Sequence, residues 1–175
     1  ESEDFYLYAG ELNQYKRPDI AIEAFNKSGK RLVVIGDGGM RKKLQAIAGP
    51  NITFLGKVPF EVLRDHFQRC RALVYPGIED FGIIPLEVAA AGRPVIAFAQ
   101  GGARETVVHG RTGLFFEQQD ADGLNAAVER MEAIHQTFDP DVMMAHAASF
   151  SSARFQQEWL DFAARARADL DFLGQ

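Results

Sequence analysis

Short apolar runs alternate with amphipathic segments along this 175-residue chain. A run that is apolar at every position, such as Leu-Val-Val-Ile at 32–35, is typical of a strand buried on both faces. Apolar residues three or four positions apart are typical of helices, and prolines or glycines at the ends of these segments fit helix starts and stops. Strands are predicted at 5–9, 32–35, 51–55, 72–75, 94–97 and 113–116. Helices are predicted at 18–28, through 44–47, and at 59–67, 85–91, 103–108, 121–133 and 152–173.

These repeated strand–helix units predict an α/β, Rossmann-like fold. Right-handed crossovers between parallel strands give a doubly wound sheet of about six strands with helices on both faces. The length suits a single domain, 1–175, and the abrupt first strand without an initiator Met suggests a piece of a longer polypeptide. In the last helix, Trp159, Leu160 and Phe162 are expected to pack against the sheet or a neighbouring domain.

Composition narrows the classes of partner. The net charge of -5 leaves no basic stripe for a phosphate backbone, so nucleic acid is not an expected partner. No apolar run approaches the roughly 20 residues of a membrane span. The single cysteine, Cys70, excludes an internal disulfide and a cysteine metal cluster, and we expect it to be a small buried hydrophobe. The four histidines show no metal-ligand spacing, and no metal site is predicted.

Two loops that follow predicted strands are weak candidates for ligand binding. Lys16 and Arg17 stand just before a helix start, where a cation can meet a phosphate, although these residues taken alone favour a solvated pair. Gly36 and Gly38 follow a buried strand and would let a ligand or a backbone approach closely. Because Arg41 replaces the third glycine, they are no dinucleotide fingerprint, and a tight turn remains the alternative.

The segment from Glu79 to Glu87 is the strongest candidate. Two carboxylates flank a loop containing Gly82 and the first turn of a predicted helix. Backbone N–H groups at a helix start, together with its positive dipole end, form an anion site without a metal. Glu87 can accept hydrogen bonds from sugar hydroxyls, or it can be an ordinary first-turn charge.

This segment resembles the E-x7-E motif of the retaining GT-B glycosyltransferases, family four. Four further segments resemble the same family in its order, so that the similarity covers about residues 5–130. The five segments are YAGELNQYKRPDIAIEAF, LVVIGDGGMRKKL, NITFLGKV, ALVYPGIEDFGIIPLEVAAAGRPVIAF and GGARETVVHGRTGLFF. The resemblance implies the C-terminal half of a GT-B fold, which binds the donor.

The resemblance also implies roles for individual residues. Lys16 matches the lysine that binds the donor diphosphate, and Glu87 matches the glutamate that holds the ribose. Glu79 matches the catalytic glutamate near the transferred sugar, orienting it and stabilising developing positive charge. The remaining donor-binding residues expected are Arg17, Gly36, Gly38, the base-contacting strip Gly56, Lys57 and Val58, and the loop Asp80, Phe81, Gly82, Ile83 and Ile84.

The implied function is donor binding in a retaining hexosyltransferase of polysaccharide or glycan biosynthesis. Its donor would be a GDP- or UDP-linked sugar, with no cofactor and no essential metal. The acceptor-binding N-terminal domain is missing from this sequence, so the isolated chain is expected to be inactive. The expected location is cytoplasmic, at the inner face of a membrane in the full-length protein. Two alternatives stay open: a non-catalytic nucleotide-binding or interaction module, and an epimerase or phosphorylase of GT-B architecture.

One position departs from the family pattern. Glu11 stands where the family usually has a second phosphate-binding arginine, just after the first-strand glycine. A carboxylate there would repel a diphosphate unless it turns away. Either Arg17 or Lys57 compensates, or the affinity for the donor is reduced.

Overall fold

The computed structural model describes residues 2–173 and contains one six-stranded sheet. All neighbouring strands are parallel, in the order β3-β2-β1-β4-β5-β6. The strands are β1 (Tyr6–Ala9), β2 (Leu32–Ile35), β3 (Ile52–Gly56), β4 (Ala72–Tyr75), β5 (Val95–Phe98) and β6 (Gly113–Phe116). The prediction of a Rossmann-like parallel sheet is therefore confirmed.

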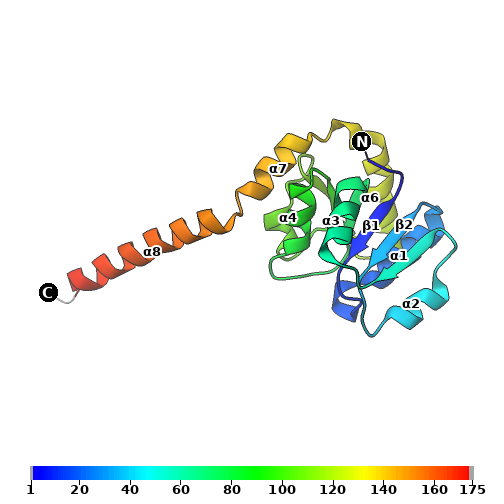
Figure 1. Ribbon diagram of the computed structural model, residues 1–175, viewed down its shortest axis with the longest axis horizontal. Helices are drawn as coiled ribbons and strands as arrows, with labels where there is room; N and C mark the ends of the chain where they lie inside the picture. Colours follow the sequence, from blue (N-terminus) through cyan, green and yellow to red (C-terminus); the bar gives the residue numbers. More distant parts are fainter. Residues whose placement is uncertain (1, 174–175) are drawn as a thin grey trace.

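Helices connect the strands and cover both faces of the sheet (Figure 1). They are α1 (Pro18–Ser28), α2 (Arg41–Ile47), α3 (Phe60–Arg69), α4 (Ile83–Ala90), α5 (Ala103–Thr106), α6 (Ala121–Ile134), α7 (Pro140–Ala148) and α8 (Ser152–Leu173), with short 3-10 turns η1 (Gln14–Lys16) and η2 (His135–Thr137). Helix α7 is absent from the predicted helices, although Asp139 caps it by accepting from the Asp141 amide and Pro140 opens it.

Alternation along the strands divides the core between the two faces. Tyr6 and Tyr8 of β1 pack with apolar residues of α1 and α6, whereas Leu7 and Ala9 pack with residues of α3, α4 and α5. Successive strand residues point to opposite faces, so a four-residue buried strand feeds both layers. Cys70 lies in the second of these layers and is fully buried, as predicted.

The carboxyl-terminal segment behaves differently from the expectation of core packing. Helix α7 packs against α4, but α8 projects away from the body of the molecule (Figure 1). Trp159, Leu160 and Phe162 are 58%, 63% and 56% exposed, so their expected packing against the sheet is wrong. Apolar residues at helical spacing indicate a helix face suited to burial, but they do not show whether the same domain or another partner buries it.

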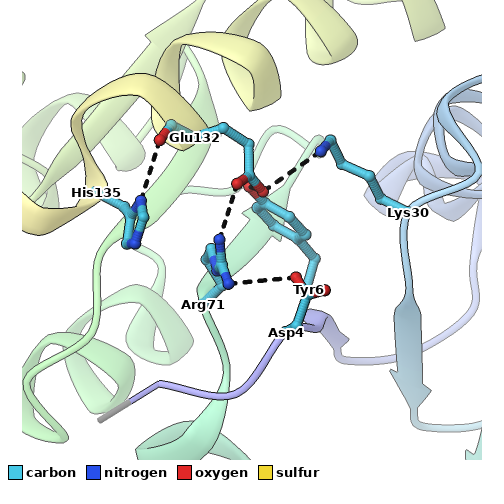
Figure 2. Close-up of polar contacts among 6 residues, drawn as sticks. All are labelled: Asp4, Tyr6, Lys30, Arg71, Glu132 and His135. Carbon is cyan, nitrogen blue, oxygen red and sulfur yellow. Dashed lines mark hydrogen bonds and ion pairs between the residues drawn. The ribbon is translucent and has the colours of Figure 1, made fainter.

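A polar cluster lies at the amino-terminal edge of the sheet, opposite the strand ends where ligands bind in such folds (Figure 2). The Glu132 carboxylate of α6 accepts a hydrogen bond from the Tyr6 hydroxyl at 2.6 Å and from Arg71 Nη1 at 2.8 Å. Lys30 Nζ lies 3.6 Å from the same carboxylate, and Arg71 also pairs with Asp4 at 3.2 Å. This cluster joins α6 to the starts of β1 and β4.

Candidate functional site

The candidate site lies where the strand order reverses. The chain leaves β1 toward β2 on one side and leaves β4 toward β5 on the other, although β1 and β4 are neighbours. The loops after these two strands therefore diverge and leave a crevice, which is the usual ligand site of an open parallel sheet. Lys16 comes from the first of these loops and Glu79 from the second.

Lys16 and Glu79 meet in this crevice. Lys16 Nζ lies 3.1 Å from Glu79 Oε1, and their side chains are only 15% and 23% exposed. The ammonium group also lies 5.6 Å from the centre of the Tyr15 ring, within the range of a cation–π contact. The structure thus brings together two candidate residues that the sequence places in separate loops, whereas their roles toward a ligand remain predictions.

A hollow of about 580 Å³ surrounds the ion pair, a size suited to a small-molecule ligand. It is lined by Tyr15, Lys16, Ile78, Glu79, Asp80, Phe81, Gly82, Ile83 and Ile84. The rim includes exposed apolar side chains, those of Tyr15, Ile78, Phe81 and Ile83. Exposed apolar groups beside a charged pair are typical of a binding site rather than of ordinary surface.

The start of α4 borders the same hollow. Gly82 caps this helix with φ of 90°, a left-handed conformation that glycine adopts readily, and the helix begins at Ile83. This start lies two residues before the predicted one at Pro85. Because the first amides of a helix have no partner within it, the N–H groups of Ile83 and Ile84 are available to an anion.

Three glycines that sequence analysis overlooked let the site loops approach one another. A Cβ on Gly77 would lie 2.7 Å from Lys16 Cα, and a Cβ on Gly102 would collide with the Phe81 backbone. The Gly102 amide also donates a 2.7 Å hydrogen bond to the Glu79 carbonyl, and Gly101 abuts the same peptide. The feature of the sequence that could have indicated these glycines is their position in the loops directly after β4 and β5.

Tyr75 is a further residue that the sequence did not single out. It ends β4 and is buried beneath the hollow. Burial raises the pKa of Tyr75 far above its usual range, and the neighbouring Glu79 carboxylate raises it further. The phenol therefore stays protonated and can donate a hydrogen bond to Glu79.

Gly36 and Gly38 lie against protein backbone. A Cβ on Gly36 would collide with the Gly10 carbonyl, and one on Gly38 would lie 2.8 Å from the Leu12 carbonyl oxygen. These two glycines therefore let the backbone of the β1 loop that leads to Lys16 approach closely, as the sequence allowed for either a ligand or a backbone. Their contact with a donor stays a prediction.

The structure does not bring Arg17 to the Lys16–Glu79 hollow. Its guanidinium pairs with Asp19 at 2.9 Å and lines a separate hollow between α1 and α2. The hydrogen bond to Asp19 raises the pKa of Arg17 further, so it stays charged. Glu11, at the departing position, is exposed and accepts a 2.7 Å hydrogen bond from Asn13 Nδ2.

The predicted base-contacting strip lies at the end of β3, two strands from β1. Gly56 is buried beside the Arg41 guanidinium, Lys57 is exposed, and Val58 is half-buried against the core. The hydrogen bond from the Gly38 amide lowers the pKa of Asp37, and the Arg41 and Lys57 charges lower it further.

Glu87 lies outside the lining of the hollow but faces the same way. It follows Ile83 by four positions, which places both on one face of α4. Its side chain is half-buried, and burial raises its pKa above the usual range. A carboxyl group held in this way favours hydrogen bonds from a ligand that compensate for its lost water.

A larger hollow of about 1030 Å³ lies beside β6 and α6. Its charged lining residues, Arg104, Glu117, Glu129 and Arg130, are exposed and of both signs. Size alone does not favour it over the smaller hollow, which combines a shielded ion pair with free helix amides at the sheet's reversal point. Among residues 2–173, no group of three or more His, Cys, Asp or Glu side chains is placed to hold a metal ion.

The parallel sheet with helices on both faces defines a Rossmann-like α/β domain. The family model described as "Glycosyl transferases group 1" matches residues 1–139. The chain therefore belongs to the glycosyl transferases group 1 family. In the part of the chain that the structure describes, no helix has the length and apolar character needed to cross a membrane.

Curated relatives are glycosyltransferases of greater length. An uncharacterized glycosyltransferase of Methanocaldococcus jannaschii is 32% identical over 130 residues, covering 71% of this chain and 37% of that protein. The GDP-mannose-dependent alpha-(1-6)-phosphatidylinositol monomannoside mannosyltransferase of Mycobacterium tuberculosis is 34% identical over 116 residues, covering 59% of this chain and 30% of that protein. The chain thus spans about a third of the length of these relatives.

Solved structures share the fold. Sucrose-phosphate synthase from Thermosynechococcus elongatus has a TM-score of 0.81 at 24% identity, covering 94% of this chain and 46% of that one. Anabaena HepE in complex with UDP-glucose has a TM-score of 0.80 at 20% identity, covering 93% and 49%. These likenesses over more than nine tenths of this chain show a shared fold, so the predicted fold class is confirmed.

Proposed function

We propose that this chain is the donor-binding domain of a retaining hexosyltransferase. The observation that carries the proposal is the pairing of Lys16 with Glu79 at 3.1 Å beside the free amides of α4. A diphosphate would take the ammonium group and these amides as partners, while Glu79 would be released to orient the sugar. Glu87 would hold the ribose from the neighbouring turn.

Two of the comparisons support a sugar nucleotide as the donor. One relative's name specifies GDP-mannose, and one structural neighbour holds UDP-glucose. We propose a GDP- or UDP-linked hexose as donor, used in polysaccharide or glycan biosynthesis without a cofactor or an essential metal. The Lys16 ammonium group and the first amides of α4 would stabilise the negative charge of the diphosphate, a role that a metal ion could otherwise have.

An acceptor-binding domain would complete the enzyme. The chain covers only 37% of its M. jannaschii relative, and the apolar stripe of α8 offers a surface for a neighbouring domain. We propose that acceptor binding resides in that other unit and that the chain alone binds donor without transferring sugar. The full-length protein would act in the cytoplasm, at the inner face of a membrane.

Calorimetric titration of the chain with GDP, UDP, ADP and the matching sugar nucleotides tests the proposal. We expect selective binding of one nucleotide, weakened about tenfold or more by Lys16→Met and by Glu87→Ala. Lys27→Met is the matched control, because Lys27 is exposed and pairs with Asp122 away from the hollow. Absence of binding to every nucleotide, or equal loss in the control, would contradict the proposal and favour an interaction module.

A further inference from the structure

An aromatic contact joins the rim of the hollow to the turn between α7 and α8. The rings of Phe81 and Phe150 are tilted by 60° with their centres 5.9 Å apart, in the range of a favourable aromatic pair. Phe81 belongs to the loop that leads into α4, whereas Phe150 follows α7. Residues distant in the sequence thus meet at the site.

Phe150 follows α7, a helix that makes several contacts with the body of the domain. Helix α7 packs against α4, its Met143 is buried in the core, and Pro140 abuts Gly92. His146 of α7 lies with its Nε2 3.0 Å from the Thr106 carbonyl at the end of α5. The same imidazole packs edge-on against the Phe150 ring, with centres 5.3 Å apart. The packing of α7 and the contact with His146 therefore position Phe150.

The loop carrying Phe81 has fewer anchors. Asp80, Phe81 and Ile83 are exposed, and the backbone is held on one side by the Gly102 amide at the Glu79 carbonyl. The ring of Phe150 packs against Phe81 and so stabilises the exposed part of this loop. Loops without such support lose order and must pay the entropy of ordering when a ligand binds.

We propose that Phe150 is a positioning residue for the donor site. By packing on Phe81, it holds the loop so that Gly82 and the first amides of α4 face the anion. This inference rests on the proposed function for its consequence in binding, but its structural part, the ordering of residues 79–84, holds without a ligand. Phe150 lies beyond residues 1–139, the part matched by the family model.

The test compares Phe150→Ala with Phe155→Ala and Phe150→Leu. Phe155 is an exposed aromatic residue that stacks on Trp159 of α8, away from the hollow, so it is the matched control. Hydrogen exchange of the free chain is measured first. Loss of the aromatic contact should speed exchange of the amides at 79–84 about three- to tenfold in Phe150→Ala, and should leave it unchanged in Phe155→Ala. The effect should be smaller in Phe150→Leu, because leucine keeps apolar packing but not the ring.

Nucleotide affinity is measured second, by calorimetry with GDP and UDP. We expect about three- to tenfold weaker binding by Phe150→Ala with little change in Tm, and a smaller loss by Phe150→Leu. Unchanged exchange at 79–84, or faster exchange throughout the chain, would overturn the proposal. If the unmodified chain binds neither nucleotide, the proposed function fails, while the exchange measurement still decides the role of Phe150.

Discussion

Replacing Glu132 by Gln tests the polar cluster that joins α6 to the start of the sheet (Figure 2). The carboxylate accepts from Tyr6 at 2.6 Å and from Arg71 at 2.8 Å, and Lys30 lies 3.6 Å away. Arg71 is only 16% exposed, and its buried Nε finds no hydrogen-bond partner among the described residues. Removal of the Glu132 charge therefore leaves a shielded guanidinium with a single, exposed partner in Asp4.

The expected loss of stability follows from what glutamine can replace. Its side-chain oxygen can still accept from Tyr6, but its NH₂ group cannot accept from Arg71. A hydrogen bond to a charged group contributes about 1.5–3 kcal/mol, and the 26% exposure of the Glu132 side chain favours the lower half of this range. We expect Glu132→Gln to lower the free energy of unfolding by about 2 kcal/mol, and Tm by about 4–8 °C.

The effect should depend on pH with a defined sign. Burial alone would raise the pKa of Glu132, but the hydrogen bond from Tyr6 and the charges of Arg71 and Lys30 outweigh it and lower the pKa. A lowered carboxyl pKa stabilises the fold above the unfolded value of about 4.3, and this stabilisation is lost as the pH falls through the folded value. The difference between wild type and Glu132→Gln should be full at neutral pH and shrink below about pH 4.

Urea denaturation at several pH values is the assay, with Glu129→Gln as control. Glu129 is an exposed residue of the same helix, and its replacement should change stability by less than about 0.5 kcal/mol. A Glu132→Gln effect no larger than this control would refute the reasoning. So would a difference that grows on acidification.

Three further predictions concern the site and α8. Glu11→Arg should tighten nucleotide binding in calorimetry, and weaker binding would contradict the assigned effect of that carboxylate. Gly77→Ala should lower the free energy of unfolding by about 1–3 kcal/mol in thermal unfolding, because its Cβ would meet the Lys16 backbone at 2.7 Å. Gly39→Ala is the control and should be near neutral, because the space around Gly39 is open. Equal effects of the two substitutions would refute the close-approach argument. Trp159 fluorescence should be quenched by acrylamide in this chain and protected once an acceptor domain is present; persistent quenching would exclude docking on the α8 stripe.

The strands were the most predictable part of the fold. The bounds predicted for β2, β4 and β6 coincide with those observed, because each is a short apolar run that must be buried on both faces. Helix α7 escaped because its apolar residues do not concentrate on one face, so only its cap signals at Asp139 and Pro140 marked it. Helix α4 begins two residues before the start that Pro85 predicts, because the left-handed Gly82 caps the helix at Ile83.

The meeting of Lys16 with Glu79 could be expected from sequence because parallel strands bring their carboxyl ends to one edge. The supports of this pair could not be expected in the same way. Gly77 and Gly102 matter because the backbones of Lys16 and Phe81 pass too close to them for a side chain. The sequence around a glycine does not show which distant backbone will lie beside it. The direction of Arg17 likewise depends on Asp19, which competes successfully for its guanidinium.

Two aromatic residues near the carboxyl terminus have different surroundings. Phe150 contacts the loop of the candidate site, whereas Trp159 is exposed on the projecting helix α8. The difference arises from α7, whose packing on α4 carries the chain past Phe81 before α8 departs. A partner that covers the α8 stripe would thus bind a helix that begins at Ser152, close to Phe150, whose ring contacts Phe81 in the loop of the candidate site.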